Sequence, residues 1–282
     1  MRIVARAPNH LGDGVMALPA IRALSMLGDL HIQAPRWGPE LYRGVDATIA
    51  APGVVASADL AVVFPPSLRT AWQARRARRR IGVASDHRGW LLTDRVVPGR
   101  HRRDTYGALA RAAGADVSGE PAWHRRPGDP LSSLPLGHVG LNPLSVSGSV
   151  REWPRFRQLA DRVDTPVFYA GPGEGGRLRP IAGRHATVVG LSLPELAAAL
   201  ARCAVFVSND SGAAHFARAC GVPTVVIFGS TAPDHTGPPG CIPVVGPRPA
   251  CAPCGRQRCR ERLGCLEVPV AEVLDALEAA RG

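Results

Sequence analysis

The chain has 282 residues, 45% hydrophobic and 20% charged, a balance typical of a globular protein of one or two domains. Its net charge is +11 and all 34 basic residues are arginine, which favours anionic partners such as phosphates, nucleotides, acidic glycolipids or membrane surfaces. Aromatic residues make up only 5%, and no helix-turn-helix, RNA-recognition or zinc-finger pattern is present, which argues against a nucleic-acid partner.

No apolar run is long enough for a transmembrane segment, and the first residues lack the apolar stretch of a signal peptide. We therefore expect a cytoplasmic protein with no transmembrane segment. In that compartment the seven cysteines are expected to be thiols or metal ligands rather than disulfides.

The amino-terminal half alternates apolar runs with helical patterns. Strands are predicted at residues 2–8, 30–35, 58–64 and 80–84, and helices at residues 15–27 and 104–113. Residues 115–136 are irregular and rich in Pro, Gly and Ser, which predicts a linker.

A second alternating series follows the linker. Strands are predicted at residues 138–143, 165–171, 205–208 and 224–229, and helices at residues 153–163, 192–203, 213–220 and 270–281. Strands that alternate with helices in two blocks predict an α/β fold with two Rossmann-like, doubly wound domains facing a cleft. We place the domains at residues 1–134 and 135–282, with the terminal helix either in the second domain or packed back on the first.

The most informative segment runs from residue 205 to 229, where a strand, a polar turn, a helix and a strand form a βαβ unit. Asp210 and Ser211 could cap the helix, and Gly212 lets a ligand approach its amino end, where free N–H groups attract phosphate. His215 lies one turn further along the same helix face. This combination favours a ligand site over an ordinary capped helix.

A second polar turn, Asn9-His10-Leu11-Gly12-Asp13-Gly14, follows the first strand and lacks the spacing of a dinucleotide fingerprint. A carboxylate at a strand-to-helix turn can act as a general base, so Asp13 is either such a base or a helix cap. His10 is either a second acid or base or a surface histidine.

Two further loops could contact a nucleotide. The Ser/Gly loop at residues 145–154 contains Arg151 and suits a phosphate cradle, although a flexible loop would look the same. Glu174, in the turn at residues 170–176, could accept hydrogen bonds from ribose hydroxyls or lie in a solvated turn.

Two further patterns each have two interpretations. Four cysteines with the spacing C-x2-C-x4-C-x5-C, of which one pair has metal-ligand spacing, are either a structural zinc site or reduced thiols: Cys251, Cys254, Cys259 and Cys265. The arginine run at residues 75–80 is either a solvated face or a contact for an anionic acceptor or a membrane surface.

Three stretches resemble the ADP-heptose:lipopolysaccharide heptosyltransferases of glycosyltransferase family 9: RAPNHLGDGVMALPAIRAL, REWPRFRQLAD and SNDSGAAHFARACGVPTVVIFGSTAPDHTGP. The CAPCGRQRC segment also looks like a cysteine cluster of that family. The resemblance implies a GT-B fold, with the acceptor on the first domain and the nucleotide-sugar donor mainly on the second.

The same resemblance implies an inverting, metal-independent transfer that needs no cofactor. It makes Asp13 the presumed catalytic base. Beside Asp13, the residues Asn9, His10 and Gly12 either contact the acceptor or only shape the loop. It also assigns to donor binding Arg151, Glu174, Asp210, Ser211, Gly212 and His215.

The resemblance leaves the substrates open. The expected reaction transfers a sugar, best guessed as heptose from ADP-heptose, to a glycolipid of lipopolysaccharide biosynthesis. The alternatives are the same chemistry with another nucleotide sugar on a small natural-product acceptor, as in antibiotic biosynthesis, and a non-catalytic nucleotide-sugar binding protein. Peripheral membrane contact through the arginine-rich surface is also predicted.

Overall fold

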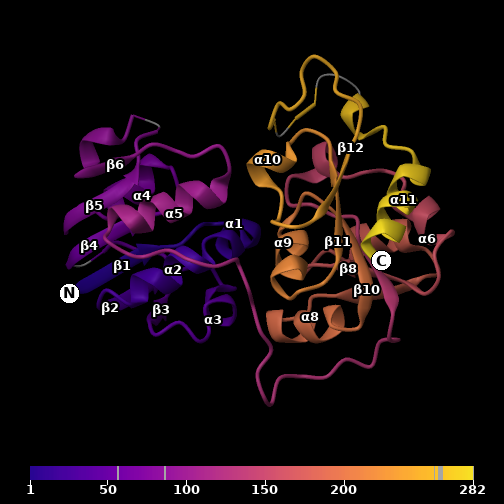
Figure 1. Ribbon diagram of the computed structural model, residues 1–282, viewed down its shortest axis with the longest axis horizontal. Helices are drawn as coiled ribbons and strands as arrows, with labels where there is room; N and C mark the ends of the chain where they lie inside the picture. The colour runs from indigo at the N-terminus through magenta and orange to yellow at the C-terminus, as the bar shows by residue number, and fades with distance from the viewer. Residues whose placement is uncertain (56, 86, 257, 260–262, 282) are drawn as a thin grey trace. The chain divides into compact units, whose positions relative to one another are not determined.

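The computed structural model describes residues 1–55, 57–85, 87–256, 258–259 and 263–281. The chain divides into two compact units, Met1–Pro121 and Ala122–Gly282. Each unit has one sheet with helices packed against it (Figure 1). No helix in the described ranges is long and apolar enough to cross a membrane.

The first unit contains a six-stranded parallel sheet in the order β3-β2-β1-β4-β5-β6. Its strands are β1 (Arg2–Arg6), β2 (Asp29–Gln33), β3 (Thr48–Ala50), β4 (Ala58–Val63), β5 (Ala77–Val83) and β6 (Asp94–Val96). Its helices are α1 (Leu11–Met16), α2 (Leu18–Ser25), α3 (Gly38–Leu41), α4 (Leu68–Gln73), α5 (Arg102–Ala112) and the short 3-10 helix η1 (Gly89–Leu91).

The second unit repeats this plan, with all strands parallel in the order β12-β11-β10-β7-β8-β9. Its strands are β7 (His138–Asn142), β8 (Pro166–Ala170), β9 (Ala186–Val189), β10 (Cys203–Asn209), β11 (Thr224–Phe228) and β12 (Ile242–Val245). Its helices are α6 (Phe156–Ala160), α7 (Gly175–Ala182), α8 (Leu193–Leu200), α9 (Gly212–Ala219), α10 (Pro233–Thr236) and α11 (Val270–Arg281), with 3-10 helices η2 (Gly148–Arg151) and η3 (Gly264–Leu266).

Both sheets have the strand order of a Rossmann fold, so the predicted α/β class and the two doubly wound sheets are confirmed. The central strands are covered on both faces, and all five residues of β11 are buried, which explains their continuous apolar sequence. In such sheets the strand order reverses between two central strands, and ligands bind at the carboxyl ends of that pair. These pairs are β1 with β4 and β7 with β10.

The helix predicted at residues 15–27 is two helices, α1 and α2, and the first begins earlier, at Leu11. Pro19 lies in the first turn of α2, where a backbone N–H has no partner within the helix, so the N–H that proline lacks is not needed there. Ser192 precedes helix α8 as its N-cap and forms a capping box, because the Ser192 and Glu195 side chains accept hydrogen bonds from each other's backbone N–H.

The boundary between the units lies before the predicted one at residues 134 and 135. Trp123 explains the difference. Its ring is buried against Phe216, with the ring centroids 5.1 Å apart, and its backbone N–H donates to the Ala219 carbonyl over 2.8 Å. The segment after residue 121 therefore belongs to the second unit. Helix α11 belongs to the second unit and buries Val273 and Leu277 in its core.

Candidate functional site

Asp13 lies in the first turn of α1, at the carboxyl end of β1 and so beside one of the two reversal points. His10, not Asp13, occupies the N-cap position, and no side chain caps this helix. The Asp13 carboxylate instead faces Arg102 on α5, whose Nη1 lies 2.9 Å from each carboxylate oxygen. The interpretation of Asp13 as a simple helix cap is therefore wrong.

The rest of the first loop is built around Arg6. This buried arginine donates to the Asn9 side-chain oxygen over 2.6 Å and to the Ala7 carbonyl over 2.5 Å, which fixes the loop after β1. Asn9 and His10 are exposed and Gly12 is buried. The predicted acceptor residues thus adjoin Asp13 in the chain, but only His10 and Asn9 present exposed side chains.

Tyr106 also reaches Asp13 and, with Arg102, was not predicted from the sequence. Burial, and then the Asp13 charge, raises the pKa of Tyr106, which stays a neutral phenol hydrogen-bonded to that carboxylate. A carboxylate offers about four lone-pair positions, so a basic and a phenolic partner together fix its orientation and leave acceptor capacity for a substrate hydroxyl.

In the second unit, the loops after β7 and β10 lie together at the other reversal point. Ser211 occupies the N-cap position of α9, but its hydroxyl makes no capping bond. The Ser211 Oγ instead donates to the Asn142 Oδ1 over 3.2 Å and lies 3.0 Å from the Ser208 Oγ. The prediction that Asp210 and Ser211 cap this helix is therefore wrong for Ser211.

Asp210 is also engaged elsewhere than at the helix start. It is only 5% exposed, accepts a hydrogen bond from the Thr236 hydroxyl over 2.9 Å, and lies 3.6 Å from the Arg151 Nη1. Arg151 ends η2 in the loop after β7, so the structure brings together two predicted donor residues that are far apart in sequence. A cation thus lies near the amino end of α9, where the Ser211 side chain makes no capping bond.

The remaining predicted donor residues have mixed environments. Gly212 begins α9, and His215 is buried on it, one turn further on. Glu174 is half-buried after β8, where it accepts from the Gly171 N–H over 2.8 Å and lies 3.6 Å from Arg177. Glu174 therefore holds its own loop in this state, and a ribose contact would have to replace or share that bond.

Two hydroxyls after β11 were not predicted as site residues. Ser230 and Thr231 are buried, and in the described part of the chain neither hydroxyl has a hydrogen-bond partner. Strand β11 pairs with β10, so this loop follows the strand next to the one that bears Asp210. A buried hydroxyl without a partner is a costly feature that a polar ligand would relieve.

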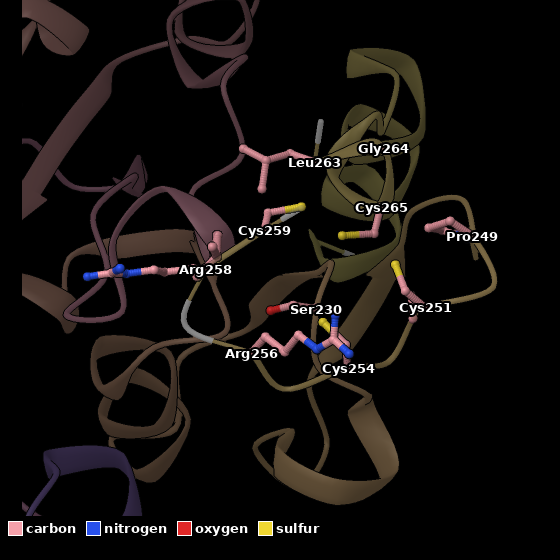
Figure 2. Close-up of a pocket in the computed structure, with 12 residues that line it drawn as sticks. Ser230, Pro249, Cys251, Cys254, Arg256, Arg258, Cys259, Leu263, Gly264 and Cys265 are labelled. Carbon is pink, nitrogen blue, oxygen red and sulfur yellow. The ribbon is translucent and has the colours of Figure 1, made fainter. Parts of the chain in front are cut away.

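The four cysteines lie around one pocket, and their sulfur atoms are directed into it (Figure 2). Burial, and then the neighbouring thiols, raises the pKa of Cys265. Their chemistry suits zinc or iron, but as the described side chains are placed no group of three or more His, Cys, Asp or Glu residues could hold a metal ion. The structural zinc site thus stays a prediction.

Comparison with known proteins finds a family likeness in the second unit. Residues 138–263 match the family model of glycosyltransferase family 9 (heptosyltransferase). Lipopolysaccharide heptosyltransferase 1 of Pseudomonas aeruginosa is 36% identical over 120 residues, a match that spans 39% of this chain and 34% of the relative. The resemblance to glycosyltransferase family 9 is confirmed.

Solved structures extend the likeness to the whole chain. The E. coli ADP-heptose lipopolysaccharide heptosyltransferase II has a TM-score of 0.77 at 22% identity and covers 100% of this chain and 98% of its own. A family 9 glycosyltransferase of Veillonella parvula has a TM-score of 0.76 at 19% identity, over 99% and 97% of the two chains. The iron-containing dodecameric glycosyltransferase TibC of enterotoxigenic E. coli has a TM-score of 0.69 at 12% identity, over 99% and 78%. At these identities the structures establish a shared fold.

Proposed function

We propose that this protein belongs to glycosyltransferase family 9 and is an inverting glycosyltransferase that moves heptose from ADP-heptose to an acceptor hydroxyl. The family match and the curated heptosyltransferase relative support the class of reaction. The observation that carries the proposal is the cation beside the amino end of α9, between the loops after β7 and β10.

The donor diphosphate is expected at this helix end. Backbone N–H groups at a helix start attract phosphate, and Ser211 leaves them available because its hydroxyl bonds to Asn142 and Ser208 instead. Arg151 adds a guanidinium that can form two parallel bonds to phosphate oxygens. Stabilisation of the diphosphate leaving group is then the main task of the second unit.

The proton acceptor is expected to be Asp13. In a single displacement, this carboxylate takes the proton of the acceptor hydroxyl as the oxygen attacks the anomeric carbon, and the nucleoside diphosphate leaves from the opposite face. Arg102 and Tyr106 orient the carboxylate for this step. Their role is positioning, since they reach the reaction through Asp13.

We further propose that the transfer needs no divalent ion at the diphosphate. Arg151 and the helix dipole supply positive charge where a metal ion would otherwise act. The pocket that the cysteines line after β12 also includes Val150 and Ser230, so a metal held there would adjoin the loops after β7 and β11. Its role would be structural, because four thiolates would fill its coordination sphere. TibC contains iron, but this chain shares only a fold with it at 12% identity, so that iron does not decide the question here.

Two alternatives remain distinct from this proposal. The same residues could use another nucleotide sugar and a small natural-product acceptor, since the contacts described above address the phosphates rather than the sugar. A non-catalytic nucleotide-sugar binding protein would need the donor residues but would have no use for a held carboxylate, so the Arg102–Asp13–Tyr106 arrangement favours an enzyme.

The test is acceptor-dependent release of nucleoside diphosphate. Purified protein is incubated with ADP-heptose, and in parallel with other nucleotide sugars, in the presence and absence of a lipopolysaccharide-core glycolipid acceptor, and product is followed by mass spectrometry. A glycosylated acceptor is expected, with an inverted anomeric configuration that NMR of the product establishes. Tight nucleotide binding without any transfer to a range of acceptors would instead establish the binding-protein alternative.

A further inference from the structure

The outer side of α4 carries large apolar side chains that face solvent. Trp72 is 50% exposed and Trp90, in η1, is 66% exposed, and their rings meet edge-on with centroids 6.4 Å apart. Leu68 lies one helical turn before Trp72 and is 45% exposed. Buried side chains beneath them join α4 to η1: Ala71, Leu91 and Leu92. The two indoles are thus held side by side on a packed support.

The same surface is positively charged. The Arg75 guanidinium carbon lies 4.6 Å from the centroid of the Trp72 ring, and Arg69, three residues before Trp72, is exposed. Residues 68–90, which span this surface, contain seven arginines and one aspartate. Arg75 is partly exposed and donates to the Trp72 carbonyl over 3.1 Å, whereas Arg79 is exposed and bound to Asp94, and Arg80 donates to the Leu91 carbonyl. The excess of arginine over carboxylate makes the surface positive.

We propose that this surface docks the protein on an anionic phospholipid membrane; its residues, named here the Trp72 patch, are Leu68, Arg69, Trp72, Arg75 and Trp90. Indole rings favour the level of lipid headgroups, because the ring is apolar and its N–H stays hydrated. Arginine side chains bury their stems beside such rings and keep their charge at the phosphates. The Trp72 patch combines apolar rings with surrounding cations, and so matches both the apolar interior and the anionic headgroups at the membrane surface.

A second copy of the chain fits this surface less well. A symmetric contact would bring the patch against itself, and so place Arg69 and Arg75 opposite like charges. A stable protein interface also needs about 800 Å² from each partner and few charged residues at its centre. Five residues with two arginines do not meet that description, whereas charge complementarity favours the anionic lipid surface.

The experiment measures binding of the whole chain to lipid vesicles by flotation and by the blue shift of tryptophan fluorescence. One set of vesicles contains phosphatidylcholine alone, and the other adds phosphatidylglycerol. The variants are Trp72→Ala with Trp90→Ala, and Arg69→Gln with Arg75→Gln. The matched control is Leu136→Ala with Arg179→Glu, which removes an exposed leucine and an exposed arginine from the second unit. Circular dichroism verifies that each variant is folded.

Wild type and control are expected to bind the anionic vesicles and to bind phosphatidylcholine far more weakly. The arginine pair variant should lose about fivefold in affinity for each charge removed, and the tryptophan pair variant should lose binding and the fluorescence shift. Equal binding by the patch variants and wild type would overturn the proposal. The proposal would also be overturned if sedimentation showed a dimer that the tryptophan pair variant cannot form while vesicle binding by that variant is unchanged. The patch would then be a contact between copies of the chain. No donor or acceptor is present, so these outcomes do not depend on whether the protein transfers a sugar.

Discussion

Replacement of Arg151 by alanine tests how the second unit holds a donor. The side chain is 23% exposed and lies 3.6 Å from Asp210, which is 5% exposed and keeps its bond from Thr236 in the variant. Breaking a fully buried ion pair costs about 3–5 kcal/mol. This looser and partly exposed pair should contribute less, and we expect unfolding in urea to lose about 1–2 kcal/mol, judged from that range.

The effect on ligands should depend on the phosphates. A hydrogen bond to a charged group is worth about 1.5–3 kcal/mol, so loss of Arg151 should weaken ADP binding by about 10- to 150-fold. Removal of the cation also leaves the Asp210 charge nearer to an incoming diphosphate. Adenosine has no phosphate and should bind Arg151→Ala within about threefold of wild type, a change of less than 1 kcal/mol.

Isothermal titration calorimetry with ADP and adenosine measures both effects. The matched control is Arg157→Ala, which removes an exposed helical arginine of the same unit. The ion pair of Arg157 with Asp161 spans 3.8 Å, and such a pair contributes about 0.3–0.5 kcal/mol to the free energy of unfolding. ADP binding by this control should not change. Equal losses for ADP and adenosine, or no loss for ADP, would refute the phosphate role of Arg151.

Two further results are expected. Burial lowers the pKa of His138, whose ring nitrogen Nε2 lies 2.7 Å from the Tyr169 hydroxyl, so the folded state favours the neutral ring. The contribution of neutral His138 to the free energy of unfolding should be complete above about pH 6.5. It should be lost as the pH falls through the lower pKa of the folded state. Urea unfolding from pH 7.5 to 5.5 should therefore show a decline that His138→Gln flattens, whereas an unchanged slope would contradict this reasoning. For the cysteines, protein purified without chelators should contain about one bound metal ion per chain, as a four-cysteine site implies. The double variant Cys251→Ser with Cys254→Ser should lose this ion, and the control variant Cys241→Ser should retain it. If mass spectrometry finds the wild-type protein free of metal, the zinc prediction is wrong. The metal-independent mechanism is wrong if EDTA abolishes sugar transfer while the cysteine-bound metal and the fold are retained, and Mg²⁺ restores the transfer.

The long, buried strands were predictable because parallel central strands are covered on both faces and so have continuous apolar sequences. The edge strands β3, β6, β9 and β12 were missed, since they are short and partly exposed, as in the Asp-Arg-Val of β6. Helix α7 was not predicted: the turn interpreted at residues 170–176 covers only its first two residues, Gly175 and Gly176, and Pro180 lies within it. Only the packing of Leu178 in the core reveals it as a helix that covers the sheet.

The candidate site was predictable where its residues follow a strand directly. Asp13 and Asp210 both come one loop after an apolar run, so the rule that ligands bind at the carboxyl ends of parallel strands located them. Arg102 could not be found in this way, because it pairs with Asp13 across 89 positions of sequence. The engagement of the Ser211 hydroxyl by Asn142 likewise depends on β7 and β10 being neighbours, which the sequence order does not reveal.

Sugar transfer by Asp13→Asn tests the central claim most directly. The amide keeps the shape of the side chain but cannot accept the proton of an acceptor hydroxyl, and general-base catalysis contributes about 10²–10⁴-fold. With ADP-heptose and a glycolipid acceptor, kcat should fall by that factor. The Kd for ADP should stay within about twofold of wild type, because the residues proposed to bind the donor belong to the second unit. A kcat close to that of wild type would show that Asp13 is not the base and would contradict the proposed mechanism.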